Sequence, residues 1–377
     1  MKALVLGCGE MAQVAIRDLL QQGVFADVVV GTRHPGRAGT FLGQVARTSV
    51  RTTAVAIDVG DHDALVKLMK SCDVVCNLAG PNFRNAVHVV QAAIAAGVSM
   101  VDVSDDFAAT LEILDLHEEA KRAGITVVLG LGASPGVTNI LAREGANKLD
   151  RVDEVHTSWV MRGSDAGGPA LAQHLLFSLP DKAFVFEDGE MKVVRPFVDG
   201  RETIVYPELG PVEVFHIGHP EPLTLSRYIK GVRYVDDKAT FLPAEVNRLI
   251  VDLGRIARQL EPVCVDGRMV DGVAFAASHL YEACKAMNDV PETGALRAEV
   301  VGELEGKRTR FIYTAAGRIG IGTGVPAAIG ASLLAIGKIR RRGVFPPEAC
   351  IEPEWFLSAV TMRDIGDVEE QVVREDV

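Results

Sequence analysis

The chain has 377 residues, of which 48% are hydrophobic and 24% charged, a composition typical of a soluble globular protein with two or three domains. Its formal net charge is −11 and its one short basic run is Arg340–Arg342, which argues against nucleic acid or a membrane surface as a partner. No stretch approaches the ~18 consecutive apolar residues that span a bilayer, and no secretory signal is visible, so we expect a cytoplasmic protein.

Short apolar runs alternate with amphipathic stretches through the first 150 residues. The apolar runs predict strands at Ala3–Leu6, Asp27–Val30, Thr53–Ile57, Asp73–Leu78, Ser99–Val103 and Thr126–Gly130. Helical periodicity predicts helices over Met11–Gln22, Asp61–Ser71, Asn82–Ala96 and Phe107–Ala123. Apolar strands that alternate with such helices indicate a parallel sheet covered on both faces. The sequence therefore predicts an α/β fold with a doubly wound Rossmann sheet.

The first strand leads into a glycine turn of the form Gly7-x-Gly9-x-x-Ala12. Gly7 allows a tight turn, Gly9 lets the backbone approach a pyrophosphate, and Ala12 lets the helix pack close to the sheet. We therefore predict that this turn binds a dinucleotide, with Glu10 and Met11 among the contacts. The alternative is a strand-to-helix corner with a purely structural role.

The end of the second strand indicates which dinucleotide binds. An NAD enzyme usually has Asp or Glu there, which holds the ribose 2′-hydroxyl. This chain has Thr32, Arg33 and Arg37 and no carboxylate, and such donors and charges suit a 2′-phosphate. NADP(H) is therefore favoured over NAD(H), and the alternative is a solvated basic loop that binds nothing.

Further cofactor contacts are expected at other strand ends, because open α/β sheets bind ligands at the carboxyl ends of their strands. Asp58 and Val59 end the third strand, where they can meet the adenine, although Asp58 has a helix cap as its alternative. The fourth strand leads into small residues that let the nicotinamide half of the cofactor lie against the backbone. The predicted contacts there are Asn77, Ala79, Gly80 and Pro81.

After Asp150 the pattern changes to an alternation of apolar and polar residues, which predicts a mixed or antiparallel sheet. The strands expected in it include Glu202–Tyr206, Glu213–Ile217 and a late hairpin of Arg297–Leu304 and Arg308–Ala315. The chain becomes helical again from Val325. We thus expect a Rossmann domain at 1–150, a second α+β domain at 151–320 and a C-terminal helical segment at 321–377.

Several short motifs accompany these features: VLGCGEMA, DVVCNLAGP, VDVSDD, GLGASPGVTNILA, GPVEVFH, TLSR and RRGVFPPE. Together they resemble the saccharopine dehydrogenase-like family, and most closely its lysine 6-dehydrogenase type. The resemblance implies an NAD(P)-dependent enzyme for a small amino acid or amine, a second domain for substrate binding and dimerisation, and a homodimer or larger homo-oligomer. It also implies that the last helix returns to the first domain. The loop Met161–Pro169, MRGSDAGGP, departs from the lysine enzymes.

An amino-acid substrate carries a carboxylate, which arginine binds through two parallel hydrogen bonds. Arg162 and Arg227 in the middle domain are the candidates for this contact, with surface ion pairing as the alternative. His174, in a predicted helix, is a further candidate for substrate binding, and helix packing is its alternative. His219 and Lys238 are also among the polar candidates of this domain.

Oxidation of an amine to an imine also needs a base that takes a proton from nitrogen. His216 at a strand end and Asp102 among crowded carboxylates are the candidate catalytic residues, and a core-edge role is the alternative for His216. Asp105 and Asp106 are expected instead to cap the next helix. In the family pattern Asn139 lies near the nicotinamide and is a candidate cofactor contact.

The sequence thus favours an NAD(P)-dependent oxidoreductase that acts on a CH–NH bond of an amino acid or related amine. Two alternatives stay open: an NADPH-dependent reductase of a C=C or C=O bond, and a regulator that binds NADP without turnover. The six cysteines show no metal-ligand spacing, and no bound metal is expected.

Overall fold

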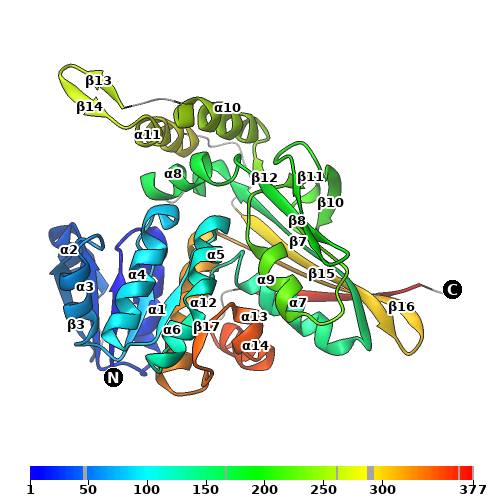
Figure 1. The fold of residues 1–377 in the computed structure, drawn as a ribbon, viewed down its shortest axis with the longest axis horizontal. Coiled ribbons are helices and arrows are strands. Elements are labelled where there is room, and N and C mark those ends of the chain that lie inside the picture. The colour runs from blue at the N-terminus through cyan, green and yellow to red at the C-terminus, as the bar shows by residue number, and fades with distance from the viewer. Residues whose placement is uncertain (46–48, 166–167, 260–261, 287–292, 364–365, 376–377) are drawn as a thin grey trace. The chain divides into compact units, whose positions relative to one another are not determined.

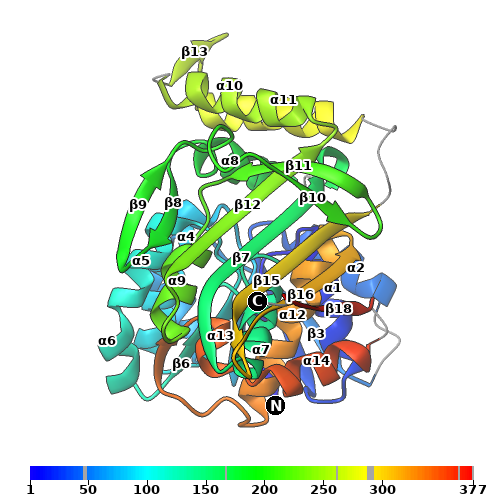
Figure 2. The same ribbon diagram turned by 90° about the vertical axis from the view of Figure 1, so that its right-hand side faces the viewer.

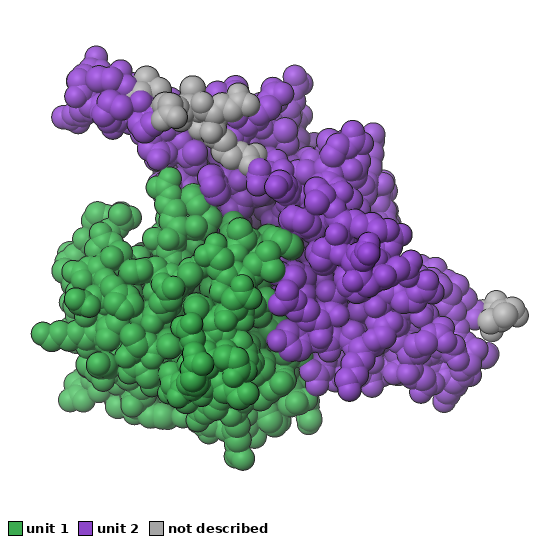
Figure 3. Space-filling view, in the orientation of Figure 1, with its two compact units in different colours: residues 1–137, 320–359 green, residues 138–319, 360–377 purple. Residues whose placement is uncertain are grey.

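The computed structural model forms two compact units, and it describes residues 1–45, 49–165, 168–259, 262–286, 293–363 and 366–375. Unit 1 consists of residues 1–137 and 320–359, and unit 2 of residues 138–319 and 360–377 (Figure 3). The division falls at the start of the helix that precedes residue 150, between its first and second residues. The last residues return to unit 2 because their strand pairs with a strand of that unit. Within the described ranges, no helix is both long and apolar enough to cross a bilayer.

Unit 1 contains a seven-stranded sheet in which every neighbouring pair is parallel (Figure 1). The strand order β17-β6-β5-β4-β1-β2-β3 is the predicted doubly wound arrangement, with β1 between β4 and β2. The strands are β1 (Lys2–Leu6), β2 (Asp27–Thr32), β3 (Arg51–Ala56), β4 (Val74–Asn77), β5 (Met100–Asp102), β6 (Thr126–Val128) and β17 (Gly343–Phe345). The helices are α1 (Glu10–Gln21), α2 (Pro35–Val45), α3 (His62–Met69), α4 (Asn82–Ala96), α5 (Phe107–Asp115), α6 (His117–Arg122), α12 (Ile319–Ala335), α13 (Pro347–Cys350) and α14 (Pro353–Thr361).

The single helix predicted over residues 107–123 is in fact two helices, α5 and α6. They meet at Leu116, whose backbone torsions, φ −78° and ψ 4°, depart from those of an α-helix. The helical periodicity continues across this break, which is why the sequence pattern alone predicted one element.

The glycines of α12 allow this helix to pack closely within unit 1. A Cβ on Gly324 would lie 2.4 Å from the carbonyl oxygen of Met11 in α1. A Cβ on Gly330 would lie 2.3 Å from Leu131 Cδ2. Only glycine permits such short approaches, which explains the sequence GIGTGVPAAIGAS in this helix.

Unit 2 contains a nine-stranded mixed sheet, and Figure 2 shows β10, β11, β12 and β7 running side by side across it. The order is β10-β11-β12-β7-β15-β16-β18, with β8 and β9 attached at β12; β7 and β12 are parallel, and the other pairs are antiparallel. The strands are β7 (Arg151–Arg162), β8 (Ala183–Glu187), β9 (Glu190–Val194), β10 (Glu202–Tyr206), β11 (Gly210–His216), β12 (Tyr234–Leu242), β15 (Gly294–Leu304), β16 (Lys307–Gly317) and β18 (Val368–Arg374). The remaining elements are α7 (Val137–Lys148), α8 (Pro169–Phe177), α9 (Glu221–Tyr228), α10 (Glu245–Gln259), α11 (Gly272–Lys285) and a small hairpin of β13 (Val263–Val265) and β14 (Arg268–Val270).

Side chains alternate between the two faces of this sheet, because successive residues of a strand point to opposite sides. On one face Trp159 and Phe241 form a core with residues of α8, α10 and α11. On the other face Val160 packs with Tyr206 of β10 and with residues of β11. Consecutive residues of β12 therefore belong to different environments, and this alternation decides the chemistry of the polar residues that the strand carries.

The late hairpin predicted from the sequence is confirmed. β15 and β16 are joined by Glu305 and Gly306, which have φ values of 54° and 75°. Two consecutive residues with positive φ are typical of a type I′ turn, whose twist matches that of the paired strands.

Candidate functional site

The glycine turn after β1 has the conformation that a dinucleotide site requires. Gly7 has a φ of +100°, and a Cβ there would lie 2.7 Å from the carbonyl oxygen of Leu78. Gly9 is the N-cap of α1, and no heavy atom outside the immediate chain lies within 4 Å of where its Cβ would be. Residues 10–12 form the first turn of the helix. The helix N-terminus thus has room for a pyrophosphate to reach the backbone N–H groups, so these residues fit the cofactor.

The loop after β2 presents two arginines to solvent. Arg33 and Arg37 are both exposed, and neither forms an ion pair with a carboxylate of the described residues. Thr32 Oγ1 accepts a hydrogen bond from the N–H of His34 at 3.2 Å, which fixes the start of the loop. Two guanidinium groups are therefore available for an anionic ligand at the end of β2.

Asp58 and Val59 lie on the loop between β3 and α3. Asp58 is exposed, and its Oδ1 accepts a hydrogen bond from the N–H of Gly60 at 3.0 Å. The helix cap is Asp61 instead, whose Oδ1 accepts from the N–H of Ala64 at 3.1 Å. Capping of α3 is thereby removed as an explanation for Asp58, and contact of Asp58 and Val59 with the adenine stays a prediction.

Asn77 and Asp102, at the ends of the adjacent strands β4 and β5, form a buried pair. Asn77 Nδ2 donates to Asp102 Oδ2 at 2.6 Å, and the N–H of Ser104 donates to Asp102 Oδ1 at 2.7 Å. Burial raises the pKa of Asp102 to about 6, although these two hydrogen bonds oppose the rise. A carboxyl group that titrates near neutral pH thus lies at the strand end where we predicted a catalytic residue, and that role stays a prediction.

The turn after β4 is shaped by the amide of Asn77. Asn77 Oδ1 accepts from the N–H of Ala79 at 3.2 Å, and the Gly80 carbonyl accepts from Asn85 Nδ2 at 3.3 Å. Pro81 is the N-cap of α4. These bonds hold the backbone of the predicted nicotinamide contacts in a defined turn.

The two carboxylates expected to cap the following helix have different partners. Asp106 caps α5 as predicted, because its Oδ1 accepts from the N–H of Ala109 at 2.8 Å. Capping is wrong for Asp105, whose Oδ1 accepts from Asn82 Nδ2 at 2.9 Å. Asp105 thus joins the loop after β5 to the start of α4.

The predicted substrate contacts lie in unit 2, in contrasting environments. Arg162, at the end of β7, is only 9% exposed, and its Nε has no hydrogen-bond partner among the described residues. His174 is buried on α8, whereas Arg227 in the last turn of α9 is exposed. Asn139, the predicted cofactor contact on α7, also belongs to unit 2, where its Nδ2 donates to Thr224 Oγ1 at 3.2 Å. Residues 166–167 of the loop after Arg162 lie outside the described residues.

Asp236 on β12 is the centre of a buried ionic network that the sequence analysis missed. Its Oδ1 lies 2.7 Å from His156 Nδ1, and its Oδ2 lies 3.1 Å from both His216 Nε2 and Lys238 Nζ. Burial alone would raise the pKa of Asp236, but these cationic and hydrogen-bonding neighbours hold it well below its ordinary value. His156 loses solvation on burial, yet Asp236 raises its pKa to about 10. His216, our predicted base, is therefore part of this network, and its catalytic role stays a prediction.

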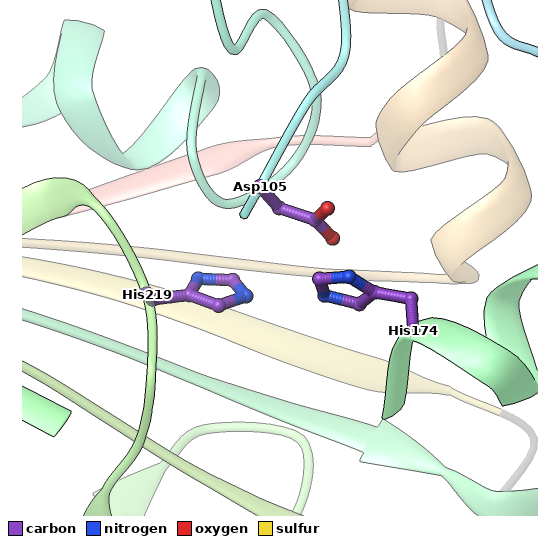
Figure 4. Close-up of side chains that lie close together, drawn as sticks. All are labelled: Asp105, His174 and His219. Atoms are coloured by element: carbon purple, nitrogen blue, oxygen red, sulfur yellow. The ribbon is translucent and has the colours of Figure 1, made fainter. Parts of the chain in front are cut away.

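Asp237, the next residue of β12, lies in a second polar cluster. Its Oδ1 accepts from Thr157 Oγ1 at 2.6 Å, and its Oδ2 lies 3.6 Å from His219 Nδ1. His219 Nδ1 also lies 3.2 Å from Glu221 Oε2. Burial and the nearby Glu221 raise the pKa of Asp237 well above its ordinary value, although His219 and Thr157 oppose the rise. Figure 4 shows His219 and His174 with their rings directed toward one another.

Of these two clusters, sequence analysis identified the histidines His174, His216 and His219 but neither aspartate. One signal was present in the stretch YVDDKATF, where two consecutive acidic residues interrupt an apolar strand. Buried carboxylates need partners, so such a pair inside a strand indicates a polar site on each face.

Comparison with known proteins adds to this geometry. Residues 3–128 match the family described as the saccharopine dehydrogenase NADP binding domain. The chain is 24% identical to carboxyaminopropylagmatine dehydrogenase of Synechocystis sp., over 95% of this chain and 94% of that protein. It is 26% identical to carboxynorspermidine synthase of Vibrio alginolyticus, over 97% of this chain and 95% of that protein. The fold is similar to that of apo saccharopine dehydrogenase (L-Glu forming) from Saccharomyces cerevisiae, with a TM-score of 0.70 and 17% identity over 99% of each chain.

The resemblance to the saccharopine dehydrogenase-like family is thus confirmed. The N-terminal part of the chain is an NADP-type binding domain, and the chain is an NAD(P)-dependent oxidoreductase of the dehydrogenase type. The narrower likeness to lysine 6-dehydrogenases stays a prediction, as does assembly into a homodimer in the cytoplasm.

Proposed function

We propose that the chain uses NADP(H) to oxidise, or in reverse to form, the CH–NH bond of a secondary amine that carries a carboxylate. Two of the similar proteins are named for carboxyaminopropylagmatine and carboxynorspermidine, both carboxylated amines by name. When bound, the nicotinamide accepts or donates the hydride at the substrate carbon. The chain must then bind the carboxylate, orient the amine and move a proton at nitrogen.

The environment of Arg162 is the observation that supports a carboxylate on the substrate. A guanidinium that is 9% exposed, and whose Nε donor has no partner among the described residues, has hydrogen-bonding capacity to offer in a buried place. A carboxylate satisfies such a donor and adds charge complementarity, often through two parallel hydrogen bonds. We assign Arg162 to the substrate carboxylate. Arg227, exposed on α9, and His174 remain candidates for further substrate contacts.

The preference for NADP(H) rests on the loop after β2. Arg33 and Arg37 are exposed and form no ion pair with the described carboxylates, so they can bind a 2′-phosphate without giving up an existing partner. The usual acidic residue that would hold the ribose 2′-hydroxyl of NAD is absent from the sequence Gly31 to His34. The cofactor preference and the substrate proposal are independent of one another.

The proposed function is tested with the wild-type chain and a panel of amines. Secondary amines with and without a carboxylate are incubated with NADP⁺, and pairs of amine and carbonyl compound with NADPH, while nicotinamide absorbance and product mass are followed. Turnover restricted to carboxylated amines is the expected result. Turnover of C=C or C=O substrates alone, or cofactor binding without any turnover, would contradict the proposal.

Arg162→Gln is expected to raise KM for the carboxylated substrate by about 10- to 100-fold, because a charge-assisted bond contributes about 1.5–3 kcal/mol. NADPH affinity should change little, since Arg162 is assigned to the substrate carboxylate and is not among the predicted cofactor contacts. Arg233→Gln is the matched control, because Arg233 is 70% exposed and pairs with Asp188. Equal KM values for Arg162→Gln and the control would remove Arg162 from the substrate site.

The double variant Arg33→Ala/Arg37→Ala is expected to weaken NADPH binding by about 100-fold, because two charge-assisted hydrogen bonds are lost. NADH binding should change little, since that cofactor has no 2′-phosphate. Fluorescence titration of both cofactors measures the effect. An equal loss for NADPH and NADH would show that the two arginines do not select the cofactor.

A further inference from the structure

Asp102, at the end of β5 in unit 1, is 0% exposed, and each of its carboxyl oxygens accepts a hydrogen bond. Oδ2 accepts from Asn77 Nδ2 at 2.6 Å, and Oδ1 accepts from the N–H of Ser104 at 2.7 Å. A buried carboxylate that two donors hold in this way has a fixed orientation. The geometry therefore suits a group that keeps other parts of the fold in place.

The amide of Asn77 connects Asp102 to the turn that follows β4. Asn77 is 1% exposed, and while its Nδ2 donates to Asp102, its Oδ1 accepts from the N–H of Ala79 at 3.2 Å. The two bonds permit only one orientation of the amide, because a reversed amide would turn its NH₂ group toward the Ala79 N–H. Asn77 therefore needs an acceptor on Asp102, and an ionised carboxylate provides one on either oxygen.

The turn after β4 lies directly against the glycine turn that fits the cofactor. A Cβ on Gly7 would lie 2.7 Å from the carbonyl oxygen of Leu78 and 3.4 Å from the nitrogen of Ala79. Two backbone segments packed this closely cannot move independently of one another. The contact completes a continuous path from Asp102, through Asn77 and the turn after β4, to Gly7.

A proton on Asp102 would break this path, because both carboxyl oxygens face N–H donors. On Oδ1 the proton would oppose the N–H of Ser104, and on Oδ2 it would oppose Asn77 Nδ2. Reversing the Asn77 amide would relieve the second conflict but would leave the N–H of Ala79 without its acceptor. Burial, opposed by the two hydrogen bonds, raises the pKa of Asp102 to about 6, and the nearby Asp105 adds to the rise.

Two titratable groups interact with Asp102 among the described residues. Asp105 lies on the loop after β5 and disfavours the ionised form of Asp102. On β4, burial raises the pKa of the Cys76 thiol, and the charge of Asp102 adds to this rise, so Cys76 stays neutral below pH 8. On the other side of β5, β6 consists of Thr126–Val128 and has no titratable side chain. A titration near pH 6 at this strand end therefore belongs to Asp102.

We propose that Asp102 is a positioning residue for the cofactor: its carboxylate orients Asn77, and Asn77 holds the turn after β4 in the place that NADP(H) requires beside Gly7. The inference rests on the cofactor part of the function proposed above and is independent of the substrate. NADP(H) accordingly binds the chain whose Asp102 is ionised. By linkage, the bound cofactor stabilises the ionised form of Asp102.

The test is calorimetric titration of NADP⁺ into the full wild-type chain and into Asp102→Asn, from pH 8 to pH 5.5. Asp102→Asn has the shape of the protonated acid and cannot ionise, so we expect it to bind NADP⁺ about 10-fold or more weakly at pH 8. The wild type should lose about 3- to 4-fold in affinity at pH 5.5, because about a quarter of Asp102 is then ionised. Asp102→Asn should not show this loss.

The 2′-phosphate of NADP⁺ also titrates near pH ~6, so the titrations are repeated with NAD⁺, which lacks that group. The difference in pH dependence between the wild type and Asp102→Asn should be the same for both cofactors. Asp73→Asn is the matched control, because it removes one carboxylate at the opposite end of β4, where Asp73 Oδ2 accepts from the N–H of Lys2 at 2.7 Å. It is expected to keep the affinity and the pH dependence of the wild type.

The exchange Asn77→Asp/Asp102→Asn restores the network with its donor and acceptor reversed. The carboxylate at position 77 then accepts from the N–H of Ala79 and from the amide at position 102, whose oxygen accepts from the N–H of Ser104. Asn77→Asp alone brings two carboxyl groups together and should weaken NADP⁺ binding. The exchange is expected to return the affinity to within about 3-fold of wild type and to restore its decline toward pH 5.5.

Far-UV circular dichroism verifies that each variant is folded, and if Asp102→Asn does not fold, the exchange decides the question alone. Equal NADP⁺ affinity in Asp102→Asn and the wild type would overturn the inference. So would a decline toward pH 5.5 that Asp102→Asn shares, or an exchange that binds as weakly as Asn77→Asp. The predicted binding by a wild type that turns over no amine would support the inference and overturn the proposed function alone.

Discussion

Asp236 and Asp237 are consecutive residues of one strand, equally buried, and they differ in almost every other respect. Each has 1% of its surface exposed. Asp236 lies among His156, His216 and Lys238, which hold its pKa far below the ordinary value. Asp237 lies beside Glu221, and its pKa is raised well above the ordinary value. The strand alternation sends one carboxyl group into a cationic environment and the other into an anionic one.

The difference shows that burial alone does not decide the state of a carboxyl group. Desolvation acts on both aspartates in the same direction, toward the neutral form. Nearby charge then decides the outcome, because cations outweigh desolvation at Asp236 while Glu221 adds to it at Asp237. An ionised group that is fully paired serves stability, whereas a carboxyl group that binds its proton readily beside a histidine suits proton transfer.

The largest effect expected from this comparison is on the free energy of unfolding. Asp236→Asn leaves His156, His216 and Lys238 without their shared counter-charge, and removing one partner from a buried ion pair costs about 3–5 kcal/mol. Asp237→Asn resembles the protonated acid, so it should change the free energy of unfolding by less than about 1 kcal/mol. Urea denaturation of both variants at neutral pH measures the difference.

The comparison predicts that Asp236→Asn lowers the free energy of unfolding more than Asp237→Asn does. Far-UV circular dichroism and NADPH titration verify that each variant is folded before denaturation. Equal losses of stability, or a larger loss for Asp237→Asn, would mean that Asp237 is ionised in the folded chain and that the two faces do not differ as described.

Unit 1 could be predicted from the sequence because its signals are local. The glycine turn, the apolar strands and the helical periodicity each lie within about 20 residues, and α4 has the bounds expected for it. The break at Leu116 was missed because it interrupts the backbone without interrupting the hydrophobic pattern. The capping role of Asp106 also followed from its place before a helix, while the partner of Asp105 required the loop geometry.

The polar clusters of unit 2 could not be predicted in the same way, because they depend on the register of strands far apart in the chain. Asp236 meets His156 and Asp237 meets Thr157 only because β12 pairs with β7 in one particular register. A shift of one residue would send each aspartate to the opposite face. The sequence identifies His219 and His216 as polar candidates, but which of them has carboxylates on Nδ1 and which on Nε2 is a property of the folded chain.

The network around Asp236 leads to a smaller prediction, a pH dependence of stability, which the cluster around Asp237 does not share. Despite the desolvation that lowers it, the pKa of His156 is raised to about 10, mainly by Asp236, whereas a histidine in the unfolded chain titrates near ~6.5. The folded chain therefore holds this proton more tightly. The resulting stabilisation is complete below pH ~6.5 and is lost as the pH rises through about 10.

Comparison of the wild type with His156→Gln isolates this contribution. The wild type is expected to be more stable near pH 6, and the difference should shrink by up to about 1.4 kcal/mol for each pH unit as the pH rises toward 10. Asp237→Asn keeps His156 and Asp236 and should show the same decline as the wild type. A wild-type advantage over His156→Gln that stays constant from pH 6 to pH 10 would mean that His156 is uncharged in the fold, and that Asp236 is held ionised by its other partners, Lys238 and His216.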